Sequence, residues 1–183
     1  IVKIQERIAK LRIGNGASTP EPDLGPLITD VHRDKVTGYI DIAEQDGATI
    51  VVDGRGIQVE GHENGFFVGP TLIDNIPTTS RAYTEEIFGP VLEVVRVESF
   101  DEGVALINSG AFGNGTAIFT NDGGAARRFQ HEIHFAAGGG APPCSIVSGT
   151  WIDEPLPPSP PARMDSSVNG SAPNSHAPSS NRI

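Results

Sequence analysis

Helical and strand-like patterns alternate along residues 1–134 of this 183-residue chain, and no other feature limits its fold so strongly. Apolar residues spaced three or four apart predict helices, whereas short β-branched runs predict buried strands. Strands that alternate with helices of this length indicate an α/β domain with a parallel sheet and flanking helices. The predicted helices cover residues 1–13, 29–45, 99–111 and 122–134, and the predicted strands cover residues 48–53, 71–76, 91–97 and 115–120.

Local signals support several of these boundaries. Ser99 followed by Glu102 is a capping box, which predicts the start of a helix, and Gly47 is expected to end the helix before it. The turn-rich segment from Gly54 to Gly65 predicts a small hairpin or excursion between two strands. The apolar faces predicted for the last two helices consist of Phe100, Val104, Ile107 and Ala111, and of Ala126, Phe129 and Ile133.

The character of the chain changes at Phe135. Residues 135–183 contain nine of the fifteen prolines and nine serines, and they show neither a helical nor a strand period. The glycine and proline runs in this stretch cannot hold a sheet ladder, because proline has no amide hydrogen to donate. We therefore divide the chain into a domain over residues 1–134 and a tail over residues 135–183, and we expect the tail to be disordered or loosely attached.

Charge and composition exclude several classes of partner. The net charge is −10, so the chain repels phosphate groups, which argues against nucleic acid and anionic membranes as partners. No apolar run reaches the ~18 residues of a membrane span, and the first residues show no signal-peptide pattern. The chain has no initiator methionine and starts inside an apparent helix, so we expect it to be a piece of a longer protein.

The segment Glu85–Val91 is the strongest candidate for a binding site. It places a carboxylate and an aromatic ring two residues apart, directly before Gly89 and Pro90. A following Gly-Pro step makes a rigid corner, because proline fixes its own φ angle. Such a corner can offer the Glu86 carboxylate as a charged acceptor and the Phe88 ring as a flat apolar face to one ligand. In the alternative interpretation, Glu86 is a solvated turn carboxylate and Phe88 is a core ring.

This corner closely resembles the Glu-x-Phe-Gly-Pro element of NAD-dependent aldehyde dehydrogenases. Further motifs resemble landmarks of that family's catalytic domain, in the family's order, over essentially all of residues 1–134. These motifs are Gly25–Ile28, Gly65–Thr71, Phe112–Thr116 and Ala117–Thr120. The segments Val51–Gly56, Gly65–Pro70 and Asn114–Phe119 are most similar to methylmalonate-semialdehyde dehydrogenases, which use NAD and coenzyme A and release an acyl-CoA.

The resemblance implies a partial aldehyde dehydrogenase catalytic domain from the C-terminal half of the enzyme. In that family the residue matching Glu86 binds the nicotinamide ribose hydroxyls, and the residue matching Phe88 packs beside the nicotinamide ring. The resemblance further implies NAD as cofactor, coenzyme A as co-substrate, a small-molecule aldehyde as substrate and a homo-oligomeric full-length enzyme. A single cysteine fits a reducing compartment, so we expect the cytoplasm, or the mitochondrial matrix in a eukaryote.

The sequence departs from the family in two places. The family's NAD-binding domain and catalytic cysteine would lie before Ile1. Beyond His134 the family continues with a buried strand, a Phe-Gly-Gly segment and an oligomerisation strand, whereas this chain turns Gly- and Pro-rich. Such a composition is typical of a GC-rich message read out of frame, and we state this as a hypothesis for residues 135–183.

The chemistry of this family needs a thiolate, donors for an oxyanion and a nicotinamide that accepts a hydride. We assign no catalytic residue here, because Cys144, the only cysteine, follows two prolines in a stretch with little predicted structure. We assign no metal site either, because His131 and His134 are one residue too close for the His-Glu-x-x-His pattern. Only Glu86 and Phe88 receive a cofactor-binding role.

Two functions remain open at this point. The first is part of an NAD-dependent dehydrogenase that converts malonate or methylmalonate semialdehyde to an acyl-CoA, with this chain alone expected to be inactive. The alternative is a non-catalytic fragment that associates with full-length subunits through exposed sheet edges. Release of NADH and size in solution distinguish the two.

Overall fold

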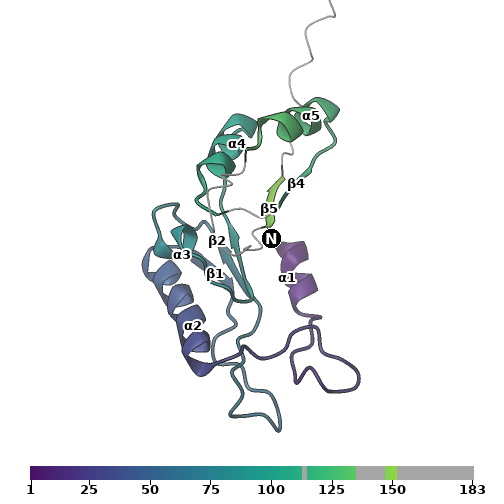
Figure 1. The fold of residues 1–183 in the computed structure, drawn as a ribbon, viewed down its shortest axis with the longest axis vertical. Helices are drawn as coiled ribbons and strands as arrows, with labels where there is room; N and C mark the ends of the chain where they lie inside the picture. The colour runs from purple at the N-terminus through teal and green to yellow at the C-terminus, as the bar shows by residue number, and fades with distance from the viewer. Residues whose placement is uncertain (113–114, 135–146, 152–183) are drawn as a thin grey trace, which may run out of the picture.

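The computed structural model describes residues 1–112, 115–134 and 147–151, in which helices and strands alternate (Figure 1). The α/β class is confirmed, and each predicted element is present but shorter than its predicted span. One short helix (α3) and one strand (β5) were not predicted. The elements in chain order are α1 (Val2–Ile8), α2 (Asp30–Gln45), β1 (Thr49–Val52), β2 (Thr71–Asp74), α3 (Arg81–Thr84), β3 (Val91–Val94), α4 (Phe100–Ser109), β4 (Gly115–Phe119), α5 (Gly123–Glu132) and β5 (Val147–Trp151).

Strands β1, β2 and β3 form a sheet in that order. Strands β2 and β3 are parallel, with Thr71 opposite Val91, whereas β1 runs antiparallel to β2, with Thr49 opposite Asp74. The sheet is therefore mixed rather than wholly parallel as predicted. A parallel return needs a crossover that is usually a helix, but the segment between β1 and β2 holds only turns. The excursion predicted there is confirmed.

Helix α2 lies along one side of this sheet (Figure 1) and contributes Val36, Tyr39, Ile40 and Ala43 to its two core clusters. Val36, Ile40 and Ala43 are fully buried, as their spacing predicts, and Ile73 of β2 is fully buried opposite them. Burial of an isoleucine-sized side chain contributes about 1.5–3 kcal/mol, so this helix–sheet contact stabilises the first part of the chain. Strand β1 was expected to be buried, but Thr49 is exposed because β1 lies at the sheet edge.

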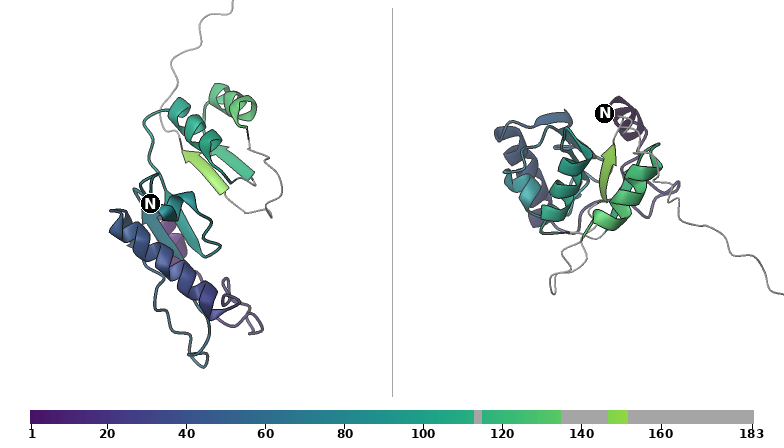
Figure 2. Two further views of the ribbon diagram at one scale, coloured as in Figure 1. Left: turned by 60° about the vertical axis from the view of Figure 1, so that its left-hand side comes forward. Right: turned by 90° about the horizontal axis from the view of Figure 1, so that it is seen from above.

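The second group of elements consists of α4, α5 and the parallel pair β4–β5, and it lies apart from the first sheet in Figures 1 and 2. Its core is formed by Phe100, Ala125 and Phe129. Two predicted inward residues are corrected. Ala126 is exposed and Ala125 is buried in its place, while Ala111 is exposed because α4 already ends at Ser109.

The predicted helix boundaries are confirmed where specific side chains or glycines create them. The Ser99 hydroxyl accepts a hydrogen bond from the Glu102 amide at 3.2 Å, which caps the start of α4. The Glu102 carboxylate accepts from the Glu98 amide at 2.8 Å, so the second bond of the capping box is made one residue earlier than the usual partner. Gly47 follows α2 with a φ of +94°, a conformation that favours glycine.

Most of the predicted tail, including residues 135–146 and 152–183, lies outside the described residues. For Val147–Trp151 the expectation of disorder is corrected, because this segment forms β5, with Val147 opposite Gly115 of β4. Its β-branched and aromatic residues are of the types that strands favour. Within the described ranges, every helix is too short or too polar to cross a membrane.

Strand β3 carries a partly buried carboxylate at Glu93. Side chains along a strand alternate between faces, so Glu93 shares its face with Val91 and Val95, which both pack against the core under α2. Its Oε1 atom is buried and has no hydrogen-bond partner among the described residues. Burial raises the pKa of Glu93 to about 7, because the charged form is disfavoured away from water.

We expect Glu93 to make the chain less stable as the pH rises from 5 to 8, by about 2–3 kcal/mol in the free energy of unfolding. The folded chain holds this proton to about pH 7, whereas the unfolded chain releases it near 4.5. The stabilisation is therefore present below the unfolded pKa and is lost as the pH passes through the folded pKa. Urea unfolding of the wild type and of Glu93→Gln at both pH values measures the difference. An identical pH dependence in the two chains would contradict this expectation.

Candidate functional site

The predicted corner lies between α3 and β3 and is tied to the sheet at its far end. The Pro90 carbonyl accepts a hydrogen bond from the Thr71 amide of β2 at 2.8 Å, and the Gly89 carbonyl accepts from the Val91 amide at the same distance. Phe88 has a φ of +54°, which is uncommon for a residue other than glycine. Backbone of this kind persists where its surroundings hold it, and it is frequent at ligand sites.

Glu86 and Phe88 both lie on this corner, two residues apart in the chain. The Phe88 side chain is an exposed large apolar residue, at 51% exposure, so it is not the core ring of the alternative interpretation. Glu86 is half-buried, and its Oε1 atom is buried without a hydrogen-bond partner among the described residues. It is therefore not a fully solvated turn carboxylate. A carboxylate oxygen away from water is stabilised by a hydrogen-bond donor, and the exposed Phe88 ring can contact a flat apolar group.

One face of α2 holds the backbone of the corner. His32 Nε2 lies 2.7 Å from the Phe88 carbonyl oxygen, and because a carbonyl only accepts, this nitrogen carries the proton and donates. Lys35 Nζ donates to the Glu86 carbonyl at 3.1 Å. Tyr39, one turn further along, donates its hydroxyl hydrogen to the Glu85 carboxylate. Three side chains on one helix face thus bind three residues of one corner.

Sequence reasoning missed His32, Lys35 and Tyr39. Their spacing of three and four residues is a helical signal that was available, since it places them on one face of a predicted helix. Their partners, however, lie 46 to 56 residues further along the chain. Spacing alone does not identify partners at such a separation.

Close packing brings the corner directly onto α2. A Cβ atom added to Gly89 would lie 2.6 Å from Val36 Cγ1 and 2.7 Å from Cγ2, distances that leave no room for it. Glycine is therefore required here by the approach of the helix and not by its φ angle. Ile87, on the same corner, packs against both core clusters of α2.

The two acidic residues of the corner have different surroundings. Arg81 donates to both oxygens of Glu85, from Nε at 2.8 Å and from Nη2 at 3.1 Å. These bonds, followed by the one from Tyr39, lower the pKa of Glu85 to about 2. Glu85 is thus ionised and fully engaged, whereas the neighbouring Glu86 carboxylate retains an unpartnered oxygen.

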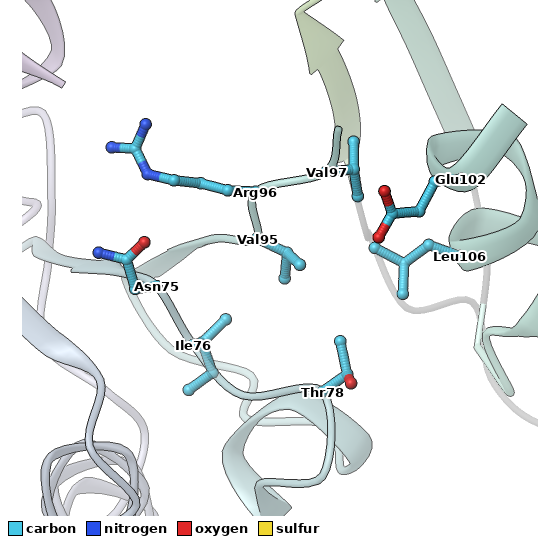
Figure 3. A pocket seen from close by; sticks show the side chains of 8 residues that line it. All are labelled: Asn75, Ile76, Thr78, Val95, Arg96, Val97, Glu102 and Leu106. Carbon is cyan, nitrogen blue, oxygen red and sulfur yellow. The ribbon is translucent and has the colours of Figure 1, made fainter. Parts of the chain in front are cut away.

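A separate cavity of about 420 Å³ lies beyond the carboxyl ends of β2 and β3, next to α4 (Figure 3). Figure 3 shows Leu106 of α4 directed toward Val95, while the Arg96 guanidinium points away and pairs with the buried Asp74 at 2.6 Å. No residue of the corner lines this cavity, so it is not part of the Glu86–Phe88 site. Its lining residues are Asn75, Ile76, Thr78, Val95, Arg96, Val97, Glu102 and Leu106.

Cys144 and a metal-binding group around His131 are the other possibilities that the sequence raises. Cys144 lies outside the described residues. His131 is exposed on α5, and the described ranges contain no group of three or more His, Cys, Asp or Glu side chains placed to hold a metal ion. The chemistry that the corner offers is ligand binding by the Glu86 carboxylate and the Phe88 ring.

Comparison with known sequences identifies close relatives. A model of the aldehyde dehydrogenase family matches residues 1–139. The chain is 55% identical over 133 residues to the malonate-semialdehyde dehydrogenase of Pseudomonas aeruginosa, a match that covers 73% of this chain and 27% of that protein. It is 47% identical over 131 residues to the acylating, mitochondrial methylmalonate-semialdehyde/malonate-semialdehyde dehydrogenase of Bos taurus, covering 72% and 24%. The chain thus spans about a quarter of the length of these relatives.

Solved structures agree with the sequence comparison. The methylmalonate-semialdehyde dehydrogenase of Oceanimonas doudoroffii superposes with a TM-score of 0.68 at 50% identity, over 72% of this chain and 27% of that one. A protein of Sinorhizobium meliloti 1021 crystallised in complex with NAD superposes with the same TM-score at 37% identity and the same coverage.

We expect Gly89→Ala to destabilise the chain by about 1–3 kcal/mol, because the added methyl group forces the corner away from Val36. Gly38→Ala on α2 is the matched control, since a Cβ atom there meets nothing within 4 Å, and alanine is the better helix former. Urea unfolding of both variants measures the effect. A Gly89→Ala variant as stable as the wild type would show that the corner does not rest on α2.

Proposed function

This chain belongs to the aldehyde dehydrogenase family, and on that premise we propose that it is the nicotinamide-ribose-binding part of an NAD-dependent, CoA-acylating semialdehyde dehydrogenase. The observation that carries the proposal is the corner itself. An exposed Phe88 ring lies two residues from a Glu86 carboxylate with an unpartnered, buried oxygen, and α2 holds both in place.

The residues of the corner fit NAD by their chemistry. A ribose presents adjacent hydroxyl groups, which are suitable donors for a carboxylate such as that of Glu86, and hydrogen bonds to a charged acceptor contribute about 1.5–3 kcal/mol each. The Phe88 ring offers the flat apolar face that confines an aromatic nicotinamide. When bound, NAD supplies the hydride acceptor of the reaction.

The anchoring of the corner favours NAD binding. A backbone that is already fixed loses less conformational entropy when the ligand binds. His32 binds the Phe88 carbonyl and Lys35 binds the Glu86 carbonyl, so the backbone on both sides of Ile87 is fixed before any ligand arrives. A nicotinamide ring held near its reacting position favours hydride transfer, because fewer of its bound orientations are unproductive.

We take the substrate and co-substrate from the relatives. Two of them are described as dehydrogenases of malonate or methylmalonate semialdehyde, and the bovine protein is described as acylating and mitochondrial. We therefore propose a semialdehyde as the substrate and coenzyme A as the acyl acceptor of the complete enzyme. The cytoplasm, or the mitochondrial matrix in a eukaryote, is the proposed location, and a homo-oligomer is the proposed assembly.

A second function is association with complete subunits. Strands β1 and β3 are the outer strands of the three-stranded sheet in the described part of the chain, and open edges of this kind can pair with another chain. Light scattering of the 183-residue chain, alone and mixed with the Pseudomonas aeruginosa relative, tests this directly. A stable mixed species supports association, and two independent species would exclude it.

We expect the charge on Glu86 to be needed for NAD binding in an active enzyme. Residues 1–134 are placed in the Pseudomonas aeruginosa relative at the matching segment to give a graft, in which Glu86→Gln keeps the shape but removes the charge. NAD binding should weaken by roughly 1–3 kcal/mol, the contribution of a charge-assisted hydrogen bond, and single-turnover NADH formation should slow. Alkylation of the graft's catalytic thiol should be unchanged, because that step does not use the ribose contact.

The control for this experiment is Glu60→Gln, which removes an exposed carboxylate far along the chain from the corner. It should leave NAD affinity and NADH formation at their original values. If Glu86→Gln behaves like Glu60→Gln, Glu86 is only a turn carboxylate and the proposed role is wrong.

A polypeptide of these 183 residues alone should not reduce NAD with malonate or methylmalonate semialdehyde, with or without coenzyme A. Its only thiol, Cys144, follows Pro142 and Pro143 and has no predicted element that would lower its pKa. The graft, assayed alongside, provides the positive control. This expectation would be overturned if the 183-residue chain produced NADH steadily and the substitution Cys144→Ala abolished that production.

A further inference from the structure

We propose that Tyr39 and Arg81 are positioning residues for Glu86, and that they act by holding the neighbouring Glu85 carboxylate away from the ligand side of the corner. The inference rests on the proposed role of Glu86 in binding a ribose. It assigns a task to Glu85, the first of the two consecutive acidic residues, for which no ligand contact is proposed.

Both oxygens of the Glu85 carboxylate accept hydrogen bonds from Arg81 and Tyr39. Arg81, four residues earlier, donates hydrogen bonds to both Glu85 oxygens, from Nε to Oε1 at 2.8 Å and from Nη2 to Oε2 at 3.1 Å. The Tyr39 hydroxyl donates to the same Oε2 atom from the opposite element, α2. A guanidinium that binds both oxygens fixes the plane of the carboxylate as well as its position.

The backbone then transmits this orientation to the next residue. Glu85 is extended, with φ of −117° and ψ of 154°, and successive side chains of an extended segment point to opposite sides. With Glu85 fixed toward Tyr39 and Arg81, the Glu86 side chain is directed away from both. The unpartnered oxygen of Glu86 and the absence of any Arg81 or Tyr39 bond to it, among the described residues, agree with this arrangement.

The charge states of Glu85 and Tyr39 keep this arrangement intact at neutral pH. The bonds from Arg81 and Tyr39 lower the pKa of Glu85 to about 2, and the Glu85 hydrogen bond in turn raises the pKa of Tyr39. Tyr39 therefore keeps its hydroxyl hydrogen as the donor, and Glu85 remains an ionised carboxylate as the acceptor, at neutral pH. Lys35 lies over the Tyr39 ring, with Nζ 5.5 Å from the centroid, while it binds the Glu86 carbonyl, so Tyr39 also supports the cation that fixes the Glu86 backbone.

The test uses the graft and removes a single hydroxyl. In Tyr39→Phe the ring that packs in the core and under Lys35 is kept, so the fold should persist. We expect the dissociation constant for NAD to rise about three- to tenfold, as for the loss of one hydrogen bond. In the Glu86→Gln background the same change should have little further effect, because Tyr39 acts through Glu86. Arg81→Lys, which keeps the charge but cannot bind both Glu85 oxygens in the bidentate geometry of a guanidinium, should weaken NAD binding in the same way.

Tyr83→Phe is the matched control, because it removes a hydroxyl from α3 that makes no hydrogen bond to the corner residues. It should leave NAD affinity unchanged. If Glu86→Gln weakens NAD binding but Tyr39→Phe does not, or if Tyr39→Phe weakens it equally in both backgrounds, the positioning role is overturned while the ribose role stands. If Glu86→Gln itself has no effect, the proposed function fails first.

Discussion

The contact between α2 and the corner before β3 is the interaction on which the rest of the first sheet depends. Val36 reaches the backbone at Gly89 so closely that no side chain fits there. The same helix buries Ile40 and Ala43 against the sheet, and its polar residues bind the corner from one side. A single helix therefore contributes both to the apolar core and to the hydrogen bonds that shape the candidate site. The stability of the first sheet and the geometry of the candidate site therefore depend on the same contact surface of α2.

The local elements of this fold could be predicted from the sequence because each has its own signal. The spacing of Val36, Ile40 and Ala43 identifies a helix, and Ser99 marks the start of another. The direction of β1 could not be predicted, because a turn-rich connection does not state whether the next strand runs parallel or antiparallel. The burial of Glu93 was missed because a lone carboxylate in an apolar run is usually placed on the solvent side.

The candidate site could likewise be predicted only in part. Glu86 and Phe88 could be named from the sequence, since they stand in one short, recognisable segment. His32, Lys35 and Tyr39 could not, because their role exists only once the chain folds back over about 50 residues. The strand Val147–Trp151 was also missed, because the proline-rich sequence around it hid a short run of strand-forming residues.

The most direct test is a crystal structure of the graft with NAD bound. We expect the Glu86 carboxylate oxygens to lie about 2.6–3.0 Å from the nicotinamide ribose hydroxyls, the range of charge-assisted hydrogen bonds. The Phe88 ring should contact the nicotinamide while Glu85 remains bound to Arg81 and Tyr39. A complex in which NAD is well ordered but its ribose contacts neither Glu86 nor Phe88 would contradict the central claim.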